Sequence, residues 1–259
     1  MTERLPGPTL VADRHDASEA TRAARHAGLV AGCIAFVGLV VRLIGIGLPP
    51  LQFHAARQLY DAQMARGFFV GIGGSVPPGW HESALAARPG VIEPPVLQGL
   101  AAVLYRLVGG ENLTLIRVVV VIIWVGASPF VWGLASRLVG RIAGVAAVGV
   151  WALAPFGVAA SRSFQPDGPM VAFIAGTLWA LVRADDEQSR RCRWFALGLG
   201  AAAILVKLVA SFFVLPVVVL YGLRWRRRMG SPDRGVVGDV AIVLAPGLGF
   251  LLVGMWSAL

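Results

Sequence analysis

The chain has 259 residues, of which 57% are hydrophobic and 14% are charged, and its mean hydropathy is +0.73. Soluble domains contain about 25% charged residues, and several apolar runs here exceed the roughly 18 residues of a membrane-spanning helix. The composition therefore excludes an ordinary soluble domain and predicts an all-α polytopic membrane protein. The net charge of +9 does not indicate nucleic acid, because the arginines gather beside apolar runs, as positive-inside topology requires.

In chain order, a polar tail at residues 1–26 precedes the first apolar run. An apolar stretch at 194–223 is too long for one spanning helix and too short for two of full length, so it predicts a hairpin with short arms. The run at 96–108 provides about 20 Å of helix against about 30 Å of hydrocarbon, so we expect that it does not cross. Single spans are predicted at 28–48, 117–136, 142–161, 169–183 and 237–257.

Four groups of arginines lie beside these runs, and the positive-inside rule places all four in the cytoplasm. That placement requires 194–223 to cross twice, which predicts about seven transmembrane helices and a cytoplasmic N-terminus. Residues 27–259 then form one transmembrane module with a long outer loop at 49–116, behind the cytoplasmic tail. The groups are Arg14, Arg22 and Arg25; Arg137 and Arg141; Arg183, Arg190, Arg191 and Arg193; and Arg224, Arg226, Arg227, Arg228 and Arg234.

The outer loop begins with a polar segment at 53–69 that predicts an amphipathic juxtamembrane helix. His54, Arg57 (or Gln58) and Asp61 recur there at spacings that place them on one helical face. The alternative is a helix that only rests on the bilayer surface through its phenylalanines.

Two acidic residues stand at the start of further predicted helices. Glu93 precedes a double proline that opens a second short amphipathic helix, and Asp167 follows Pro166 just before the span at 169–183. Each carboxylate also has an ordinary structural interpretation, as a partner of the helix dipole or as an N-cap.

Lys207 is the only lysine in the chain and lies inside the apolar stretch AAAILVKLVASFFVLP, residues 201–216. An ionisable group in such surroundings costs several kcal/mol unless it is paired or reaches water, so it indicates a functional site. The alternative is a lysine that snorkels to the interface. The outer face would thus gather carboxylates and cations that suit a substrate with a phosphate head and a lipid tail: His54, Asp61, Glu93 and Asp167 with Arg57, Arg117, Arg162 and Lys207.

The order of these motifs resembles the protein-mannosyltransferase and aminoarabinose-transferase branch of the GT-C glycosyltransferases, the family 39-like enzymes. The resemblance covers about residues 28–225 and depends on order and spacing rather than on one motif. Its parts are H-x-x-R-Q at His54, Arg57 and Gln58; E-P-P at Glu93; Arg117 at the start of a span; S-R-x-F-x-P-D ending at Asp167; and Lys207 in a hairpin.

By this resemblance, the chain would be an inverting glycosyltransferase with a GT-C fold in a bacterial plasma membrane. It would use a polyprenyl-phosphate sugar donor and a glycan, lipid or protein acceptor on the outer face. The resemblance implies active-site positions for Glu93 and Asp167. We further expect Arg57, Lys207 and Arg117 to bind the donor phosphate.

Two departures from the family pattern matter. Most members carry Asp-Glu in the first loop, where this chain has Arg57 and Gln58. The general base must then be Asp61, His54 or Glu93, with Asp61 preferred and His54 second, or the base is missing. Members also continue beyond the seventh span, so the chain is expected to be truncated there.

Other functions and cofactors remain open at this stage. A divalent metal near Glu93 is compatible with the chemistry, although no ligand spacing indicates one. A transporter or flippase would use Lys207 and Asp167 as an intramembrane ion pair, but the matched broken halves of such proteins are not visible. An inactive scaffold that has lost its base is the third interpretation.

Overall fold

The computed structural model describes residues 10–51, 53–80, 93–229 and 234–256, and all regular secondary structure in these ranges is helical. Parts of the predicted tail (1–9), of the predicted outer loop (52 and 81–92) and of the chain end (257–259) lie outside the described residues. The all-α class predicted from composition is confirmed for the described part of the chain.

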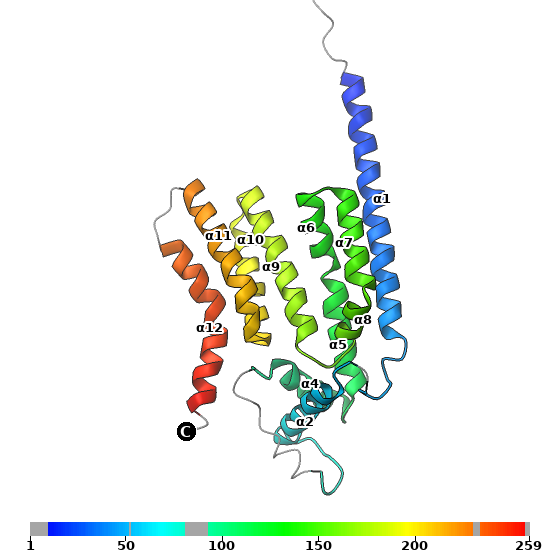
Figure 1. Cartoon of the computed structure of the whole chain (residues 1–259), viewed down its shortest axis with the longest axis vertical. Helices are drawn as coiled ribbons and strands as arrows, with labels where there is room; N and C mark the ends of the chain where they lie inside the picture. The colour runs from blue at the N-terminus through cyan, green and yellow to red at the C-terminus, as the bar shows by residue number, and fades with distance from the viewer. Residues whose placement is uncertain (1–9, 52, 81–92, 230–233, 257–259) are drawn as a thin grey trace, which may run out of the picture.

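Most helices run along a common bundle axis, whereas α2 (Ala55–Gly71) and α4 (Val96–Val108) lie at one end of the bundle (Figure 1). We call this end the α2/α4 end. The helices along the axis are α1 (Leu10–Leu43), α5 (Leu113–Gly126) continued by α6 (Ser128–Leu138), α7 (Arg141–Leu153) followed by α8 (Pro155–Ser161), α9 (Asp167–Glu187), α10 (Arg190–Val206), α11 (Ser211–Met229) and α12 (Arg234–Trp256).

Three helices in the described residues are long and apolar enough to span a membrane: Thr21–Leu43, Leu113–Leu138 and Leu208–Arg228. A fourth span results if α7 and α8 count as one. These findings support a polytopic helical membrane protein, while seven crossings stay a prediction. Large apolar side chains also face outward along the bundle, as contact with lipid requires: Leu29, Phe36, Ile122, Val150, Phe212 and Leu252.

The predicted hairpin at 194–223 is formed by α10 and α11, which are joined through the short 3₁₀ helix η1 (Leu208–Ala210). Lys207 ends α10 with an extended backbone, φ −156° and ψ 117°, so the lysine occupies the break between the two arms. The run at 96–108 forms α4 at the bundle end, as its short length predicts (Figure 1).

The arginine groups at the helix junctions lie at the end opposite α2 and α4 (Figure 1). Arg137 of α6 contacts Asp186 of α9 at 3.0 Å and Glu187 at 2.6 Å. Arg228 of α11 lies 3.2 Å from Asp185 of α9. These ion pairs hold neighbouring helices together at a single end of the bundle.

The predicted span at 142–161 is broken in the structure: α7 and α8 meet at an angle of 56°. Pro155 begins α8 and has no backbone N–H, so the carbonyl of Trp151 loses its helical partner. Arg42 of α1 donates Nη2 to this carbonyl at 3.3 Å and Nη1 to the carbonyl of Ala152 at 2.5 Å. The arginine therefore satisfies backbone groups that the break leaves exposed.

Arg42 is completely buried, and its Nε also donates to the hydroxyl of Ser161 at 2.6 Å. Its helix approaches α7 closely at Gly38, where a Cβ would lie 2.8 Å from the Cβ of Ala152. Glycine at this position thus brings the guanidinium within reach of the bend, and the bend positions α8 and the loop that leads into α9.

Replacing Arg42 with Leu is expected to lower the stability of the fold by about 2 kcal/mol, because the carbonyl of Ala152 would be buried without a donor. The thermal unfolding midpoint of the purified protein in detergent measures this loss. Arg191→Leu is the matched control, since Arg191 is exposed and its replacement should leave the midpoint unchanged. An Arg42→Leu protein that melts with the wild type would contradict this role.

Candidate active site

Lys207 lies between two carboxylates at the α2/α4 end of the bundle. Its Nζ is 2.9 Å from Oδ1 of Asp167 and 3.7 Å from Oε1 of Glu93. The lysine comes from the end of α10, the aspartate from the start of α9, and the glutamate from the segment before α4. The side chains of Asp167 and Glu93 are 41% and 27% exposed, so a molecule at this end can reach both.

Helix α2 contributes two further charged groups to this cluster. Arg57 forms an ion pair with Glu93, and its Nε lies 3.4 Å from Oδ2 of Asp61, one helical turn later. Oδ1 of Asp61 accepts a hydrogen bond of 2.7 Å from Gln98 of α4. Asp61 is completely buried, and its Oδ2 accepts no hydrogen bond from the residues that the structure describes. We call Arg57, Asp61, Glu93, Asp167 and Lys207 the ionic cluster.

The environment of α2 shifts the pKa values of the two side chains that it contributes to the ionic cluster. Burial raises the pKa of the Asp61 carboxyl to about 6, although the hydrogen bond from Gln98 and the charge of Arg57 act in the opposite direction. Burial acts to lower the pKa of Arg57, but attraction by Asp61 and Glu93 outweighs it and the net pKa is raised. Asp61 thus titrates closer to neutral pH than an ordinary aspartate.

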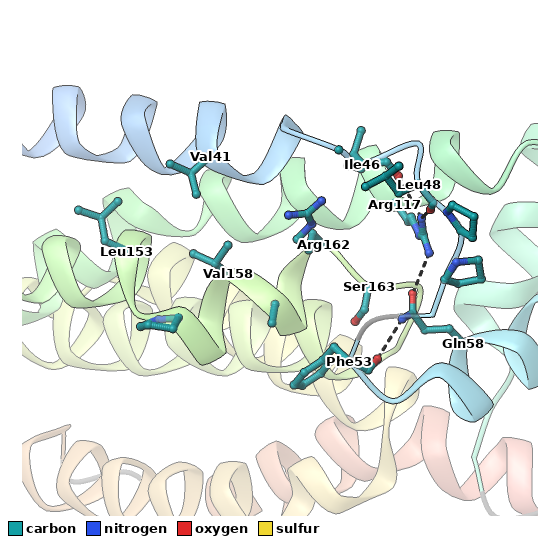
Figure 2. Close-up of a pocket in the computed structure, with 15 residues that line it drawn as sticks. Val41, Ile46, Leu48, Phe53, Gln58, Arg117, Leu153, Val158, Arg162 and Ser163 are labelled. Atoms are coloured by element: carbon teal, nitrogen blue, oxygen red, sulfur yellow. Dashed lines mark hydrogen bonds between the residues drawn. The ribbon is translucent and has the colours of Figure 1, made fainter.

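A cavity of about 490 Å³ lies between the end of α1, α8 and the segment that leads into α2 (Figure 2). Arg117 of α5 lines it and donates to the carbonyls of Ile46 at 3.0 Å and Leu48 at 2.7 Å. It also donates to Oε1 of Gln58 at 3.2 Å, and the same oxygen accepts from the backbone N–H of Phe164 at 3.1 Å. Arg117 therefore belongs to the cavity, and its hydrogen bonds to Ile46, Leu48 and Gln58 do not reach the ionic cluster.

His54, like Arg117, is a predicted site residue that the structure does not bring to the ionic cluster. It precedes α2 with a left-handed backbone, φ 54°, so its side chain does not continue the helical face of Arg57 and Asp61. The imidazole is exposed and meets the ring of Phe53 edge-on at 4.6 Å. The predicted residues that do converge are Arg57, Asp61, Glu93, Asp167 and Lys207.

Two residues of the region were missed by sequence reasoning. Arg42 carries the same signal as Lys207, a lone cation within an apolar run, and could have been found by it. Gln98 carries none, because a glutamine near the start of a short helix is usually solvated; only the packing of α4 against α2 shows that it holds Asp61.

The ionic cluster does not fit a divalent metal. In the described ranges, no group of three or more His, Cys, Asp or Glu side chains is placed to hold a metal ion. Lys207 and Arg57 already stand between the carboxylates that a cation would need as ligands. We therefore assign no step of the chemistry to a metal.

A family model for dolichyl-phosphate-mannose-protein mannosyltransferases matches residues 92–251, which is more than half of the chain. The chain belongs to this family. It is a membrane glycosyltransferase of the GT-C type, as its motif order predicts. Neither a curated protein nor a solved structure matches the chain. The matched region of this mannosyltransferase-family chain contains Glu93, Arg117, Asp167 and Lys207, whereas the contribution of α2 rests on geometry alone.

Asp61→Asn is expected to remove part of the pH dependence of stability. Folding raises the Asp61 pKa from 3.8 to about 6, so the ionised carboxylate destabilises the folded state, by about 3 kcal/mol for a shift of this size. This cost is absent below about pH 4 and fully present above about pH 6. The thermal unfolding midpoint of the Asp61→Asn variant should therefore equal that of the wild type near pH 4 and lie above it near pH 7.

Thermal unfolding in detergent across this pH range tests the shift. Asp186→Asn is the control, because Asp186 is a carboxylate at the opposite end of the bundle whose exposed ion pair with Arg137 contributes less than about 1 kcal/mol. A wild type and an Asp61→Asn variant that respond identically to pH would show that Asp61 titrates as an ordinary aspartate.

Proposed function

We propose that the chain transfers a sugar from a polyprenyl-phosphate-linked donor to a hydroxyl group of a glycan, lipid or protein acceptor, with inversion at the anomeric carbon. The observation that carries the proposal is the meeting of Glu93, Asp167 and Lys207, from three distant segments, at one accessible end of the bundle. Membership of a glycosyltransferase family supports a lipid-linked donor.

We assign the α2/α4 end to the outer face of a bacterial plasma membrane. The arginine-rich helix junctions lie at the other end (Figure 1), and such junctions favour the cytoplasm. In this orientation residues 1–26 are a cytoplasmic tail, and 49–116 form the outer loop that carries α2 and α4. The ionic cluster then faces the leaflet where a translocated lipid-linked sugar would be used.

Asp167 is our candidate for the general base. Its side chain is the most exposed carboxylate of the ionic cluster, whereas Asp61, first in order of preference from the sequence, is completely buried. Geometry takes precedence over pKa in choosing a base, because the group must reach the proton that it accepts. Asp61 instead orients Arg57, which holds Glu93.

The reaction is a direct displacement. Asp167 accepts the proton of the acceptor hydroxyl while the hydroxyl oxygen attacks the anomeric carbon. The bond from that carbon to the phosphate oxygen breaks, and its electron pair leaves with the lipid phosphate. Lys207 and Arg57 hold the carboxylates of Asp167 and Glu93 in place. Cationic side chains stabilise the negative charge that develops on the departing lipid phosphate.

Asp167→Asn is expected to reduce sugar transfer by about 100-fold or more, since a positioned general base contributes about that factor. Lys207→Met should reduce transfer as well, because Glu93 and Asp167 would lose the ammonium that holds them. The measurement is incorporation of radiolabel from a panel of polyprenyl-phosphate sugars into membranes that contain the full-length protein.

Asp186→Asn serves as control, because it removes a carboxylate at the opposite end of the bundle and should leave transfer unchanged. Full transfer by Asp167→Asn would shift the role of base to Glu93 or to another group. No transfer by the wild type with any donor of the panel would sink the enzyme proposal and favour a transporter or an inactive scaffold.

A further inference from the structure

The cavity beside α8 has an unusual balance of charge. Arg117 and Arg162 both line it, and no Asp or Glu is among its lining residues (Figure 2). Arg117 is buried and Arg162 is half-buried, and the completely buried Arg42, next to the lining residue Val41, adds a third guanidinium close by. In the part of the chain that the structure describes, none of these three arginines forms an ion pair with a carboxylate.

Within the described ranges, the hydrogen bonds of these arginines all go to neutral partners. Arg162 donates Nη2 to the carbonyl of Ile44 at 2.6 Å, and the Nη groups of Arg117 donate to two carbonyls and to Gln58. Arg117 is only 5% exposed, yet its Nε is buried without a hydrogen-bond partner among the described residues. Neutral partners satisfy donors but do not neutralise charge, so the cavity keeps an uncompensated positive potential.

The ionic cluster has the opposite balance. There, Arg57 and Lys207 stand against three carboxylates, which leaves a net negative charge. A phosphate would be repelled by that excess and attracted by the cavity, where guanidinium groups match phosphate oxygens in geometry as well as in charge. Charge alone therefore directs an anionic headgroup to Arg117 and Arg162.

The rest of the cavity suits a hydrocarbon chain. Apart from the two arginines, its walls are mainly apolar and come from α1, the loop after it, and the bent pair α7–α8; they include Val41, Leu48, Phe53, Leu153, Pro155 and Val158. A half-open site with arginines and apolar walls is complementary to a phosphate attached to a lipid chain rather than to a free anion.

We propose that this cavity binds the phosphate of a lipid phosphate, with Arg117 and Arg162 on the phosphate oxygens and the adjoining chain between α1 and α8. The identity of the lipid as the polyprenyl-phosphate donor rests on the proposed function; the anionic lipid site itself does not. The assignment moves phosphate binding away from Lys207 and Arg57, makes Arg162 a binding residue, and leaves the carboxylates of the ionic cluster to the acceptor.

Direct binding of a radiolabelled short-chain polyprenyl phosphate to the purified full-length protein in detergent tests the site without any transfer reaction. The wild type should bind it at least about tenfold more tightly than the matching polyprenol, which lacks the phosphate. Arg162→Gln should weaken binding about tenfold, the size expected for loss of one charge-assisted contact, and Arg162→Lys should lose less.

Two further variants separate loss of the site from loss of the fold. Val158→Phe leaves every charge in place but fills the apolar wall, so it should weaken binding of the lipid phosphate. Arg191→Gln, at the opposite end of the bundle, should bind as the wild type does. Unchanged binding by both Arg162→Gln and Val158→Phe, or equal binding of the polyprenol, would overturn the proposal.

Competitors identify the source of the phosphate. Weak competition by phosphatidylglycerol and by inorganic phosphate supports a polyprenyl phosphate ligand. Equal competition by phosphatidylglycerol supports an anionic lipid site but assigns it to bulk phospholipid, and equal competition by inorganic phosphate overturns the role of the lipid chain. If the protein binds the polyprenyl phosphate but transfers no sugar, the lipid phosphate site stands and the proposed function fails. If the protein transfers sugar but Arg162→Gln and Val158→Phe bind the polyprenyl phosphate as the wild type does, the proposed function stands and this site fails.

Discussion

The ammonium of Lys207 is the group on which the arrangement at the α2/α4 end depends. Glu93 and Asp167 belong to segments more than seventy residues apart and would repel each other if they met without a cation between them. Lys207 contacts both, and Arg57 extends the same set of ion pairs to α2. The lysine at the break between α10 and η1 thus connects α2 and the segment before α4 to the bundle through ion pairs.

The bundle accommodates its buried cations in two different ways. Lys207 is paired with carboxylates, whereas Arg42 is held by carbonyls that the α7–α8 break sets free and by the hydroxyl of Ser161. The first arrangement offsets the charge of the cation, and the second leaves that charge in place within apolar surroundings, where it acts over a longer range than in water. The arginines of the cavity, Arg117 and Arg162, are held in the second way, whereas the ionic cluster sets three carboxylates against two cations. The two sides of α2 therefore differ in sign, with the ionic cluster negative and the cavity positive.

Local sequence patterns predict much of this fold, but they do not predict the bend between α7 and α8. Run lengths and arginine groups predict the helices of the bundle, and the isolation of Lys207 among apolar residues predicts its importance. Proline alone does not reveal the break at Pro155, because Pro216 and Pro246 lie inside intact helices. Helical spacing likewise groups His54 with Asp61, yet a left-handed residue at the helix start places the histidine outside the cluster and packing buries the aspartate.

Two structural elements, α2 and residues 162–167, each contribute one residue to the cavity and one to the ionic cluster. The backbone of these elements therefore fixes the distance between the two sites. On α2, Gln58 lines the cavity and the adjacent Arg57 belongs to the cluster; in residues 162–167, Arg162 lines the cavity and Asp167 belongs to the cluster. Gln58 also accepts a hydrogen bond from the N–H of Phe164, in the middle of that loop. Because this bond ties loop to helix, a displacement of either element moves both sites together. In the proposed reaction, a substrate with its phosphate on one side and its reacting carbon toward the other would therefore find cation and carboxylate held in a fixed relation by this bond, as positioning for displacement requires.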